Sequence, residues 1–287
     1  MTNRSEQYWV ASGGLGFDCL GWLWERPLVW LGIIDPRLFI VVTKTLSWDR
    51  IIGNQRANPL YCVRPLGNWF DPDGFVNSVG LSNPGYRWWL KSVAPKMDFS
   101  WSRIVVSVSP SGVPDIESFQ KMIIEIDSLG QLLAGIELNP SCPNVDGFNS
   151  TEIISYIKAA RQVTNLPLWL KLSVAQKIEE IIPVIEKDVA GISINAVSWE
   201  LVYPNRTSPL SHLGGGAVSG RPAREINWEL VRRIKSISDV RIIIPDIWDE
   251  SDLMAARELG YNDYSFGSVH ICRPWWPTAC VRRMITD

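Results

Sequence analysis

LWLKLSVAQKIEEIIPVIEKDVAGISI, residues 168–194, contains the repeating unit on which the fold of this chain rests. Its two ends, LWLKL (168–172) and AGISI (190–194), are short and almost continuously apolar, as strands buried on both faces of a parallel sheet are. Between them, residues 175–187 carry apolar side chains at helical spacing. A strand, a helix and a second strand in this order predict a βαβ unit with parallel strands.

The same alternation of apolar run and helical pattern continues along the chain. Further strands are predicted at 8–11, 39–43, 103–108, 135–138, 240–244 and 263–266. Further helices are predicted at 115–133, 150–162, 223–237 and 250–259. Ser150 is the expected N-cap of the helix that it begins, and Gly260 is the expected stop of the last helix. Eight strands alternating with helices predict an α/β fold, a single (β/α)8 TIM barrel domain over residues 1–287.

One connection is far longer than the others. About sixty residues separate the second strand from the third, and they include Pro59, Pro65, Pro72 and Pro84 with several Gly and Asn. We therefore expect a long inserted loop after strand two. A loop of this length in a compact domain usually serves function, and the site of a barrel is built from the loops at the carboxyl ends of its strands.

The composition excludes several classes of protein. The 287 residues are 46% hydrophobic and 20% charged, which is a globular balance rather than a disordered one. The 28 Lys and Arg against 30 Asp and Glu give a net charge of −2, so no global positive field is available to bind nucleic acid. Two histidines are too few for metal sites that need several imidazoles.

The cysteines indicate a reducing compartment. Five cysteines lie at irregular spacing with no CxxC, which disfavours a disulfide framework or a zinc site. The N-terminal residues are polar and lack the apolar core of a secretory signal. We therefore expect a cytoplasmic protein.

Tryptophan is unusually frequent, with fifteen in the chain. The segment 17–34 is rich in Trp and Leu but also carries Asp18, Glu25, Arg26 and Pro27, so it is a poor membrane span. A buried or interface-forming helix is the favoured interpretation, and a peripheral membrane contact is the alternative. No role is assigned to the Trp-rich part, residues 20–32.

Polar side chains follow the predicted strands at the edge where a barrel has its site. Four amides, two ammoniums and one thiol converge there: Asn77, Asn139, Asn144, Asn195, Lys44, Lys171 and Cys142. Amides both donate and accept hydrogen bonds, so a ring of them suits a flat polar heterocycle with alternating C=O and N–H groups. The lysines suit an anionic ligand or a cofactor that becomes anionic. Gly-rich turns such as 214–220 let backbone N–H groups approach a phosphate.

These motifs resemble those of the dihydroorotate dehydrogenases, the FMN enzymes of pyrimidine (UMP) synthesis. The similar phrases are VVTKTLSWDRIIGNQRANP (41–59), FVNSVGLSNPG (75–85), IELNPSCPNVDG (136–147), LWLKLS (168–173), ISINAV (192–197), GGGAVSG (214–220) and SFGSV (265–269). They occur in the expected order over roughly residues 8–270. The resemblance implies a flavin oxidoreductase that uses FMN to oxidise dihydroorotate to orotate.

The resemblance also implies a role for individual residues. Cys142 would be the base that takes the C5 proton of dihydroorotate while a hydride leaves C6 for flavin N5. Lys44 would lie between the flavin and the substrate carboxylate, and Lys171 near flavin N1/O2, where a cation stabilises the reduced ring. The residues expected at the substrate are Asn77, Gly80, Leu81, Asn139, Asn144 and Asn195. The residues expected at FMN are Ser12, Gly13, Lys44, Thr45, Asn139, Lys171, Asn195, Gly220, Gly267 and Ser268, of which Gly220, Gly267 and Ser268 would hold the phosphate.

A cysteine base in place of a serine indicates the soluble class of the family, without a membrane span. The electron acceptor stays open between fumarate, used by a homodimeric type, and NAD, reached through an iron–sulfur partner subunit. We expect a homo-oligomer, a dimer, with dihydroorotate and orotate as small-molecule partners and no nucleic-acid partner.

Two departures from the family pattern stand out. The family normally has a Gly-Gly-Ile phosphate loop after the seventh strand, and this chain has Pro245 and Asp246 there. A proline removes one donor, and a carboxylate would repel the phosphate unless it turns away. Ala196 stands where the family usually has a hydroxyl, so one hydrogen bond to substrate or flavin is lost.

Two other functions stay open. One is a related flavin barrel that acts on another pyrimidine, either a free base or a tRNA uridine, although the pI near 5.8 weighs against tRNA. The other is a non-catalytic remnant that binds a nucleotide or serves as a subunit. The retained Cys142, Lys44 and Lys171 weigh against that remnant.

Overall fold

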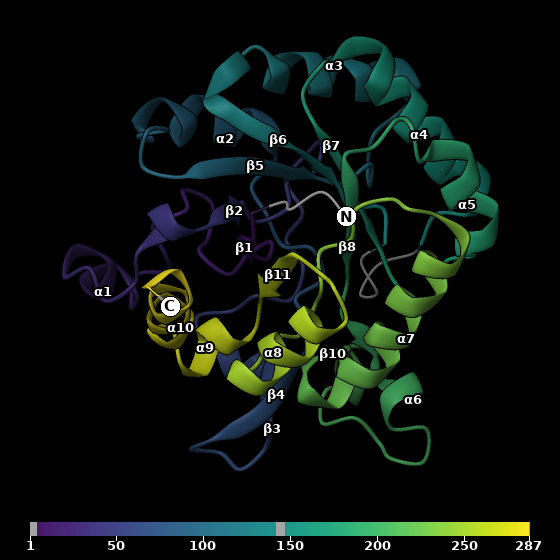
Figure 1. The fold of residues 1–287 in the computed structure, drawn as a ribbon. Helices are drawn as coiled ribbons and strands as arrows, with labels where there is room; N and C mark the ends of the chain where they lie inside the picture. The colour runs from purple at the N-terminus through teal and green to yellow at the C-terminus, as the bar shows by residue number, and fades with distance from the viewer. Residues whose placement is uncertain (1–4, 142–146, 287) are drawn as a thin grey trace.

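The computed structural model describes residues 5–141 and 147–286, and a rolled parallel sheet lies at its centre (Figure 1). The strands of this sheet are β1 (Gln7–Val10), β2 (Ile40–Val42), β5 (Arg103–Val108), β6 (Leu133–Leu138), β7 (Leu168–Leu172), β8 (Gly191–Ile194) and β11 (Asp263–Phe266). They pair in the order β11-β1-β2-β5-β6-β7-β8, all in parallel. The apolar runs of the sequence therefore became neighbouring buried strands.

The predicted strand at 240–244 closes the sheet into a barrel by two single bridges. Ile242 pairs with Ile192 of β8, and Ile244 pairs with Tyr264 of β11. On the β8 side, the Ile243 N–H donates to the Ile192 carbonyl at 2.8 Å. On the β11 side, the Ile244 N–H donates to the Asp263 carbonyl at 2.8 Å. These pairings complete an eight-stranded α/β barrel, so the predicted fold class is confirmed.

The longer helices surround this barrel on the outside (Figure 1). They are α3 (Ile116–Asp127), α4 (Ser150–Val163), α5 (Ile178–Ile185), α7 (Arg221–Ile237), α8 (Glu250–Glu258) and α10 (Trp276–Thr286). The shorter helices are α1 (Arg26–Trp30), α2 (Tyr86–Ser92), α6 (Trp199–Val202) and α9 (Val269–Cys272). The prediction of Ser150 as an N-cap is wrong by one residue, because Asn149 accepts from the Glu152 N–H and forms a reciprocal capping box with it.

The barrel interior changes from apolar to polar along the strands. Side chains alternate between the two faces of a strand, so every second residue points inward. Trp9, Val105, Trp169 and Ile243 pack together as one apolar cluster. The large indole of Trp169 has room because a Cβ at Gly191 would lie 2.5 Å from it. Two residues further along β5, β6, β7 and β8 the alternation brings Ser107, Glu137, Lys171 and Ser193 to the interior.

The long connection after β2 is ordered structure, so its prediction as a loop is wrong. It contains the hairpin of β3 (Val63–Gly67) and β4 (Pro72–Asn77), followed by α2. A second sheet forms when β4 pairs antiparallel with β10 (Ala217–Gly220), which in turn pairs with β9 (Val197–Ser198). This four-stranded sheet joins the insert to the chain that follows β8.

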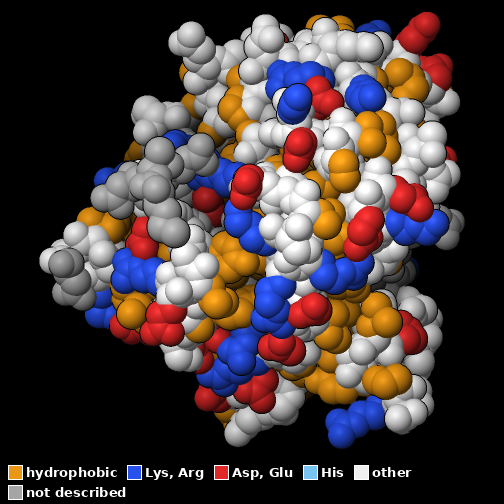
Figure 2. Space-filling view, turned by 45° about the vertical axis from the view of Figure 1, so that its right-hand side comes forward, with side chains coloured by type: hydrophobic (Ala, Val, Ile, Leu, Met, Phe, Trp, Pro, Cys, Tyr) orange, Lys and Arg blue, Asp and Glu red, His pale blue; other side chains and the backbone are white. Residues whose placement is uncertain are grey.

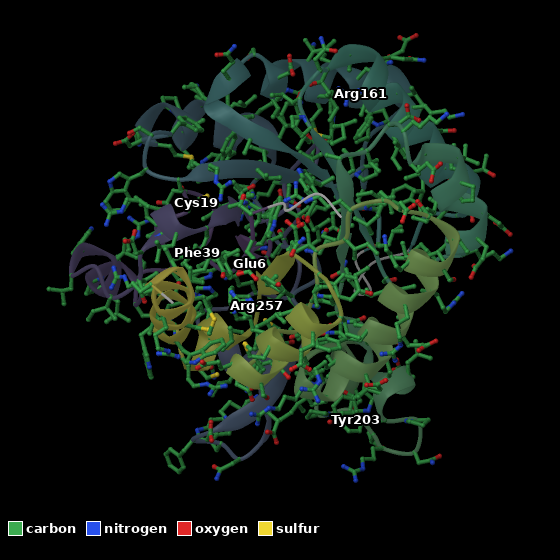
Figure 3. All side chains as sticks on the ribbon, in the orientation of Figure 1. Glu6, Cys19, Phe39, Arg161, Tyr203 and Arg257 are labelled. Carbon is green, nitrogen blue, oxygen red and sulfur yellow. The ribbon has the colours of Figure 1, made fainter. Side chains whose placement is uncertain are left out.

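The surface carries charges of both signs. On the face shown in Figure 2, Lys and Arg side chains are interspersed with Asp and Glu. Glu6 and Arg257, which Figure 3 labels, form an ion pair with a 2.6 Å hydrogen bond that ties the start of the chain to α8. Among the described residues, no helix is long and apolar enough to cross a membrane.

Candidate active site

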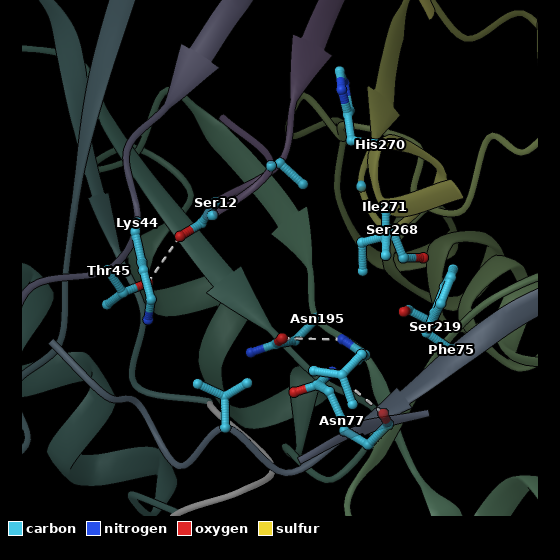
Figure 4. Close-up of a pocket in the computed structure, with 18 of the residues that line it drawn as sticks. Ser12, Lys44, Thr45, Phe75, Asn77, Asn195, Ser219, Ser268, His270 and Ile271 are labelled. Atoms are coloured by element: carbon cyan, nitrogen blue, oxygen red, sulfur yellow. Dashed lines mark hydrogen bonds between the residues drawn. The ribbon is translucent and has the colours of Figure 1, made fainter. Parts of the chain in front are cut away.

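A cavity of about 570 Å³ lies at the carboxyl ends of the barrel strands (Figure 4). A cavity of this size suits a small-molecule ligand or cofactor. Most of the residues singled out in the sequence line it: Ser12, Gly13, Lys44, Thr45, Asn77, Leu81, Asn139, Lys171, Asn195, Gly267 and Ser268. These residues come from segments far apart in the chain, so the fold brings them together.

One end of the cavity carries a group of polar side chains, which we call the amide end and define as Thr45, Asn139, Lys171 and Asn195. The Asn195 side-chain amide donates to Asn139 Oδ1 at 3.2 Å and to the Ser141 carbonyl at 3.0 Å. The Asn139 amide donates to Thr45 Oγ1 at 3.1 Å. Each amide is held by its neighbour, so the amide end has one defined orientation toward a ligand.

Lys171 of the amide end is 7% exposed, and a buried acid accompanies it. Its Nζ lies 3.7 Å from Oε1 of Glu137, a residue of β6 that is 2% exposed. The hydroxyls of Ser107 and Ser193 donate to the two Glu137 oxygens at 2.8 and 2.7 Å. Sequence reasoning missed Glu137, although a charged residue inside an otherwise apolar strand is a signal that it has a partner.

Lys44 and Asn77 face the cavity from the loop after β2 and from the end of β4. The Lys44 Nζ donates to the Ser82 carbonyl at 2.6 Å and lies 5.7 Å from the centre of the Phe17 ring. The Asn77 amide donates to the Ala217 carbonyl of β10 at 3.4 Å. The second sheet therefore positions Asn77, which the barrel alone does not hold.

Two of the predicted residues that the structure describes, Gly80 and Gly220, do not line the cavity. Cys142 and Asn144 lie outside the described residues, although Ser141, directly before Cys142, is buried and donates to the Lys171 carbonyl at 2.7 Å. Gly80 is not in the cavity wall, and its neighbour Leu81 is, with φ of 54°. A Cβ at Gly80 would lie 3.5 Å from the amide of Asn54, so this glycine faces the inserted segment instead.

The opposite end of the cavity is organised by a carboxylate, and we call Gly220, Asn227 and Asp246 the Asp246 end. Gly220 was expected to bind phosphate, but its N–H donates to Asp246 Oδ1 at 2.9 Å. The Asn227 amide donates to Asp246 Oδ2 at 2.6 Å. The carboxylate therefore does not turn away from the Gly220 N–H, which is one of the groups expected at the phosphate. Burial raises the pKa of Asp246 to about 6, against the opposing effect of these two hydrogen bonds.

The Trp-rich segment forms part of the cavity wall, a role that the sequence did not indicate. Trp22, Trp24 and Glu25 all line the cavity. The Trp22 Nε1 donates to the Gly13 carbonyl at 3.0 Å, and its ring stacks on Trp24 at 5.8 Å. Burial raises the pKa of Glu25 to about 7. This segment therefore contributes aromatic surface beside Gly13.

His270 is a further lining residue that sequence reasoning left without a role. It is 1% exposed, and neither ring nitrogen has a hydrogen-bond partner among the described residues. Burial lowers its pKa to about 4, so the imidazole is neutral near pH 7.

Comparison with known proteins settles the family. The sequence model of the dihydroorotate dehydrogenases matches residues 42–245, which is more than half of the chain. The chain belongs to the dihydroorotate dehydrogenase family. Its members are flavin oxidoreductases, which confirms that class of enzyme for the chain at the level of the family.

Individual family members are similar to this chain at modest identity. The catalytic subunit of dihydroorotate dehydrogenase B (NAD(+)) from Latilactobacillus sakei subsp. sakei is 26% identical over 219 residues, covering 71% of this chain and 69% of the relative. Dihydroorotate dehydrogenase A (fumarate) from Lactobacillus delbrueckii subsp. bulgaricus is 27% identical over 208 residues, covering 69% and 67%. Ligand-free DHODH from Eimeria tenella has the same fold, with a TM-score of 0.62, 17% identity and coverage of 85% and 76%. The chain is therefore a divergent family member.

Proposed function

We propose that this chain oxidises dihydroorotate to orotate in pyrimidine biosynthesis, using a flavin held in the cavity. The observation that carries the proposal is the amide end. Amides from β4, from the end of β6 and from the end of β8 meet two lysines in one cavity of a family barrel. Donors and acceptors at this spacing suit a pyrimidine ring, and the lysines suit its carboxylate.

The chain's own residues divide the proposed work between them. Asn77, Asn139, Asn144 and Asn195 hold and orient the pyrimidine. Lys44 would neutralise the carboxylate, and Lys171, paired with Glu137, would supply a buried cation to the flavin ring. Cys142 takes the C5 proton of dihydroorotate, since a thiolate is accessible near neutral pH.

When bound, the flavin would accept the hydride from C6 of dihydroorotate, and the C5–C6 bond of the substrate would become a double bond. FMN is the form that the resemblance implies, and the two ends of the cavity fit it unequally. The amide end suits the isoalloxazine ring, whose edge carries alternating C=O and N–H groups. The Asp246 end does not fit the phosphate in the arrangement described, because a carboxylate occupies the Gly220 N–H.

The proposed setting is the cytoplasm, with the whole chain acting as one barrel domain and assembling as a dimer. Relatives named for NAD and for fumarate both match this chain, so the acceptor is proposed only as one of the two. Turnover with fumarate alone would assign it to the first type. Turnover that needs NAD and a co-purified iron–sulfur protein would assign it to the second.

Flavin reduction by dihydroorotate tests the proposal. Flavin-loaded protein mixed anaerobically with dihydroorotate should lose its flavin absorbance, and orotate should perturb the same spectrum. Cys142→Ser should still bind orotate but should be reduced at least about a hundredfold more slowly, the scale of a lost general base. Cys272→Ser, which removes a half-buried thiol outside the cavity wall, serves as the matched control and should be reduced at the wild-type rate. An unreduced flavin in the wild type, or an unchanged rate in Cys142→Ser, contradicts the proposed chemistry.

A further inference from the structure

At the Asp246 end, the acid is held in a defined position by its neighbours and does not project freely from the surface. Asp246 lines the cavity and is half-buried, and its φ of 58° is a left-handed conformation that few side chains adopt. That conformation turns the carboxylate back onto the Gly220 N–H, at the residue that precedes α7. Of the three residues expected at a phosphate, Gly220 thus has its N–H already bound to an internal anion, while Gly267 and Ser268 line the cavity.

The cations near this end are bound by other acids. Arg224 of α7 pairs with the buried Asp252 of α8. Arg221 pairs with Asp73 and Asp249. Among the described lining residues there is no arginine, and the two lysines are Lys44 and Lys171, both assigned above to the ring and the substrate. The Asp246 end therefore has one negative charge, on Asp246, and the described cavity wall has no cation left there to offset the negative charge of a ligand.

The remaining free group at this end is an acceptor. Asn227 is 1% exposed and lines the cavity, and its Oδ1 has no hydrogen-bond partner among the described residues. A buried acceptor without a donor is unfavourable, so a ligand that brings a donor is favoured here. Hydroxyl groups donate to both amide and carboxylate oxygens, whereas a phosphate dianion only accepts.

We propose that Asp246 replaces the cofactor phosphate in this chain, so that the cavity takes a phosphate-free flavin, riboflavin, in preference to FMN. The inference rests on the proposed flavin function. The isoalloxazine ring lies at the amide end, and the polyol chain runs toward the Asp246 end. Its terminal hydroxyl donates to Asp246 or to Asn227 Oδ1.

Charge decides between the two flavins. A phosphate monoester carries about −1.5 to −2 charges at pH 7, and placing it against a buried carboxylate costs several kcal/mol, which is a loss of at least about a hundredfold in affinity. Riboflavin has no charge to lose. Removing the charge from position 246 should therefore reverse the preference without touching the ring site.

The experiment measures affinity directly. Apoprotein is titrated with riboflavin and, separately, with FMN near pH 7.5, and binding is followed by quenching of flavin fluorescence. The wild type should bind riboflavin at least about tenfold more tightly than FMN. Asp246→Asn and Asp246→Gly should each gain at least about tenfold in FMN affinity, with riboflavin affinity changed far less. Asp249→Asn, an acid of the same loop outside the cavity wall, is the matched control and should keep the wild-type ratio.

The outcomes separate this inference from the proposed function. If the wild type binds FMN as tightly as riboflavin, or if both Asp246 variants leave the ratio unchanged, the role of Asp246 is overturned and the flavin function stands. If neither flavin binds the wild type or the variants, both proposals are overturned. Circular dichroism of each variant confirms that it is folded. Because Asn and Gly differ in size and polarity, the same result with both variants attributes the change in affinity to the lost charge and not to the new side chain.

Discussion

The amide end and the Asp246 end both follow barrel strands, yet their polar groups are satisfied in different ways. At the amide end, Asn195 donates to Asn139, Asn139 donates to Thr45, and all three residues line the cavity. At the Asp246 end, the carboxylate consumes the backbone donor that a ligand would use. At the first end the polar side chains bond to one another, whereas at the second a carboxylate of the chain takes the place that we propose a ligand phosphate would need. A barrel can therefore hold half of a site constant while the other half changes its chemistry.

The largest expected effect lies under the amide end, where Lys171 and Glu137 share one buried charge pair. Lys171→Met should lower the free energy of unfolding by about 3–5 kcal/mol, because it leaves the Glu137 carboxylate buried without its cation. The double variant Glu137→Gln/Lys171→Met should lose clearly less, since no charge is left unpaired. Urea unfolding followed by circular dichroism near neutral pH measures both. Equal losses in the two variants would show that the pair does not act as a unit.

The next largest effect is at the Asp246 end and has the opposite sign. Because burial raises the pKa of Asp246 to about 6 from its ordinary 3.8, its charge destabilises the folded state above pH 6, by roughly 3 kcal/mol. The protonated form of Asp246 stabilises the folded state fully at pH values below the ordinary pKa of 3.8. This contribution is lost as the pH rises through the raised pKa of about 6. Asp246→Asn should therefore be more stable than the wild type near pH 7.5, with the gap closing between pH 6 and pH 4.

Asp249→Asn provides the control for that experiment. Burial acts to raise its pKa, but hydrogen bonds from Ser251 and Arg221 outweigh it and hold the pKa of Asp249 at about 2. Its ionised form therefore stabilises the folded state above its ordinary value, and the variant should lose stability near neutral pH. Denaturation at several pH values should give curves of opposite slope for the two variants. Parallel curves would mean that Asp246 is not buried in its charged form.

The pH dependence of FMN binding sharpens the same comparison. A protonated Asp246 no longer repels phosphate, and the phosphate itself loses charge below its second pKa near 6. Wild-type FMN affinity should therefore rise as pH falls from about 7.5 to 5, more steeply than that of Asp246→Asn, in which only the phosphate titrates. The groups that act on Asp246 here are Asn227 and Arg224 from α7 and Asp252 from α8. Identical slopes in both proteins would remove Asp246 from the explanation.

A smaller effect is expected for the substrate amides. Asn77→Ala should weaken orotate binding by about 1–3 kcal/mol, because buried groups of the ligand lose a partner. The riboflavin-to-FMN affinity ratio should stay at its wild-type value, since the Asp246 end is untouched. Orotate titration of flavin-loaded protein measures the first quantity. Unchanged orotate affinity would place the pyrimidine elsewhere in the cavity.

The smallest effect concerns Ala196, a departure from the family at the amide end. Ala196 lines the cavity, and its N–H donates to Asn195 Oδ1 at 3.0 Å. Ala196→Ser restores a hydroxyl and should tighten the binding of orotate or flavin by about 0.5–1.5 kcal/mol. Isothermal titration with each ligand detects a change of this size. A loss of affinity would show that the wall has closed around the methyl group.

The barrel strands and much of the cavity could be predicted because the signals are local. An apolar run such as 168–172 indicates a strand buried on both faces, and the residue after such a run lies at the edge that holds the site. The second sheet could not be predicted, because Val76 pairs with Val218, which lies far away in the sequence, and each partner strand is short. The local sequence of β4 does not indicate that β10 is its partner, and the local sequence of β10 does not indicate β4.

The two ends of the cavity differ in the same respect. Asn139 and Asn195 were expected to converge because both follow strands of one barrel. Asp246 was recognised as a departure, but its bond to Gly220 depends on a backbone angle and on the approach of a residue 26 positions earlier. The single N-cap error at Ser150 has a simpler cause, since Asn149 is as good a capping residue.

The left-handed backbone at position 246 has a consequence for how this family can evolve. Glycine, asparagine and aspartate all adopt a φ near 58°, so any of the three can occupy the position while the loop keeps its path. Ligand preference at this position is thereby separated from folding. On this proposal, a single substitution at position 246 that the barrel tolerates would change the preferred ligand from riboflavin to FMN, or from FMN to riboflavin.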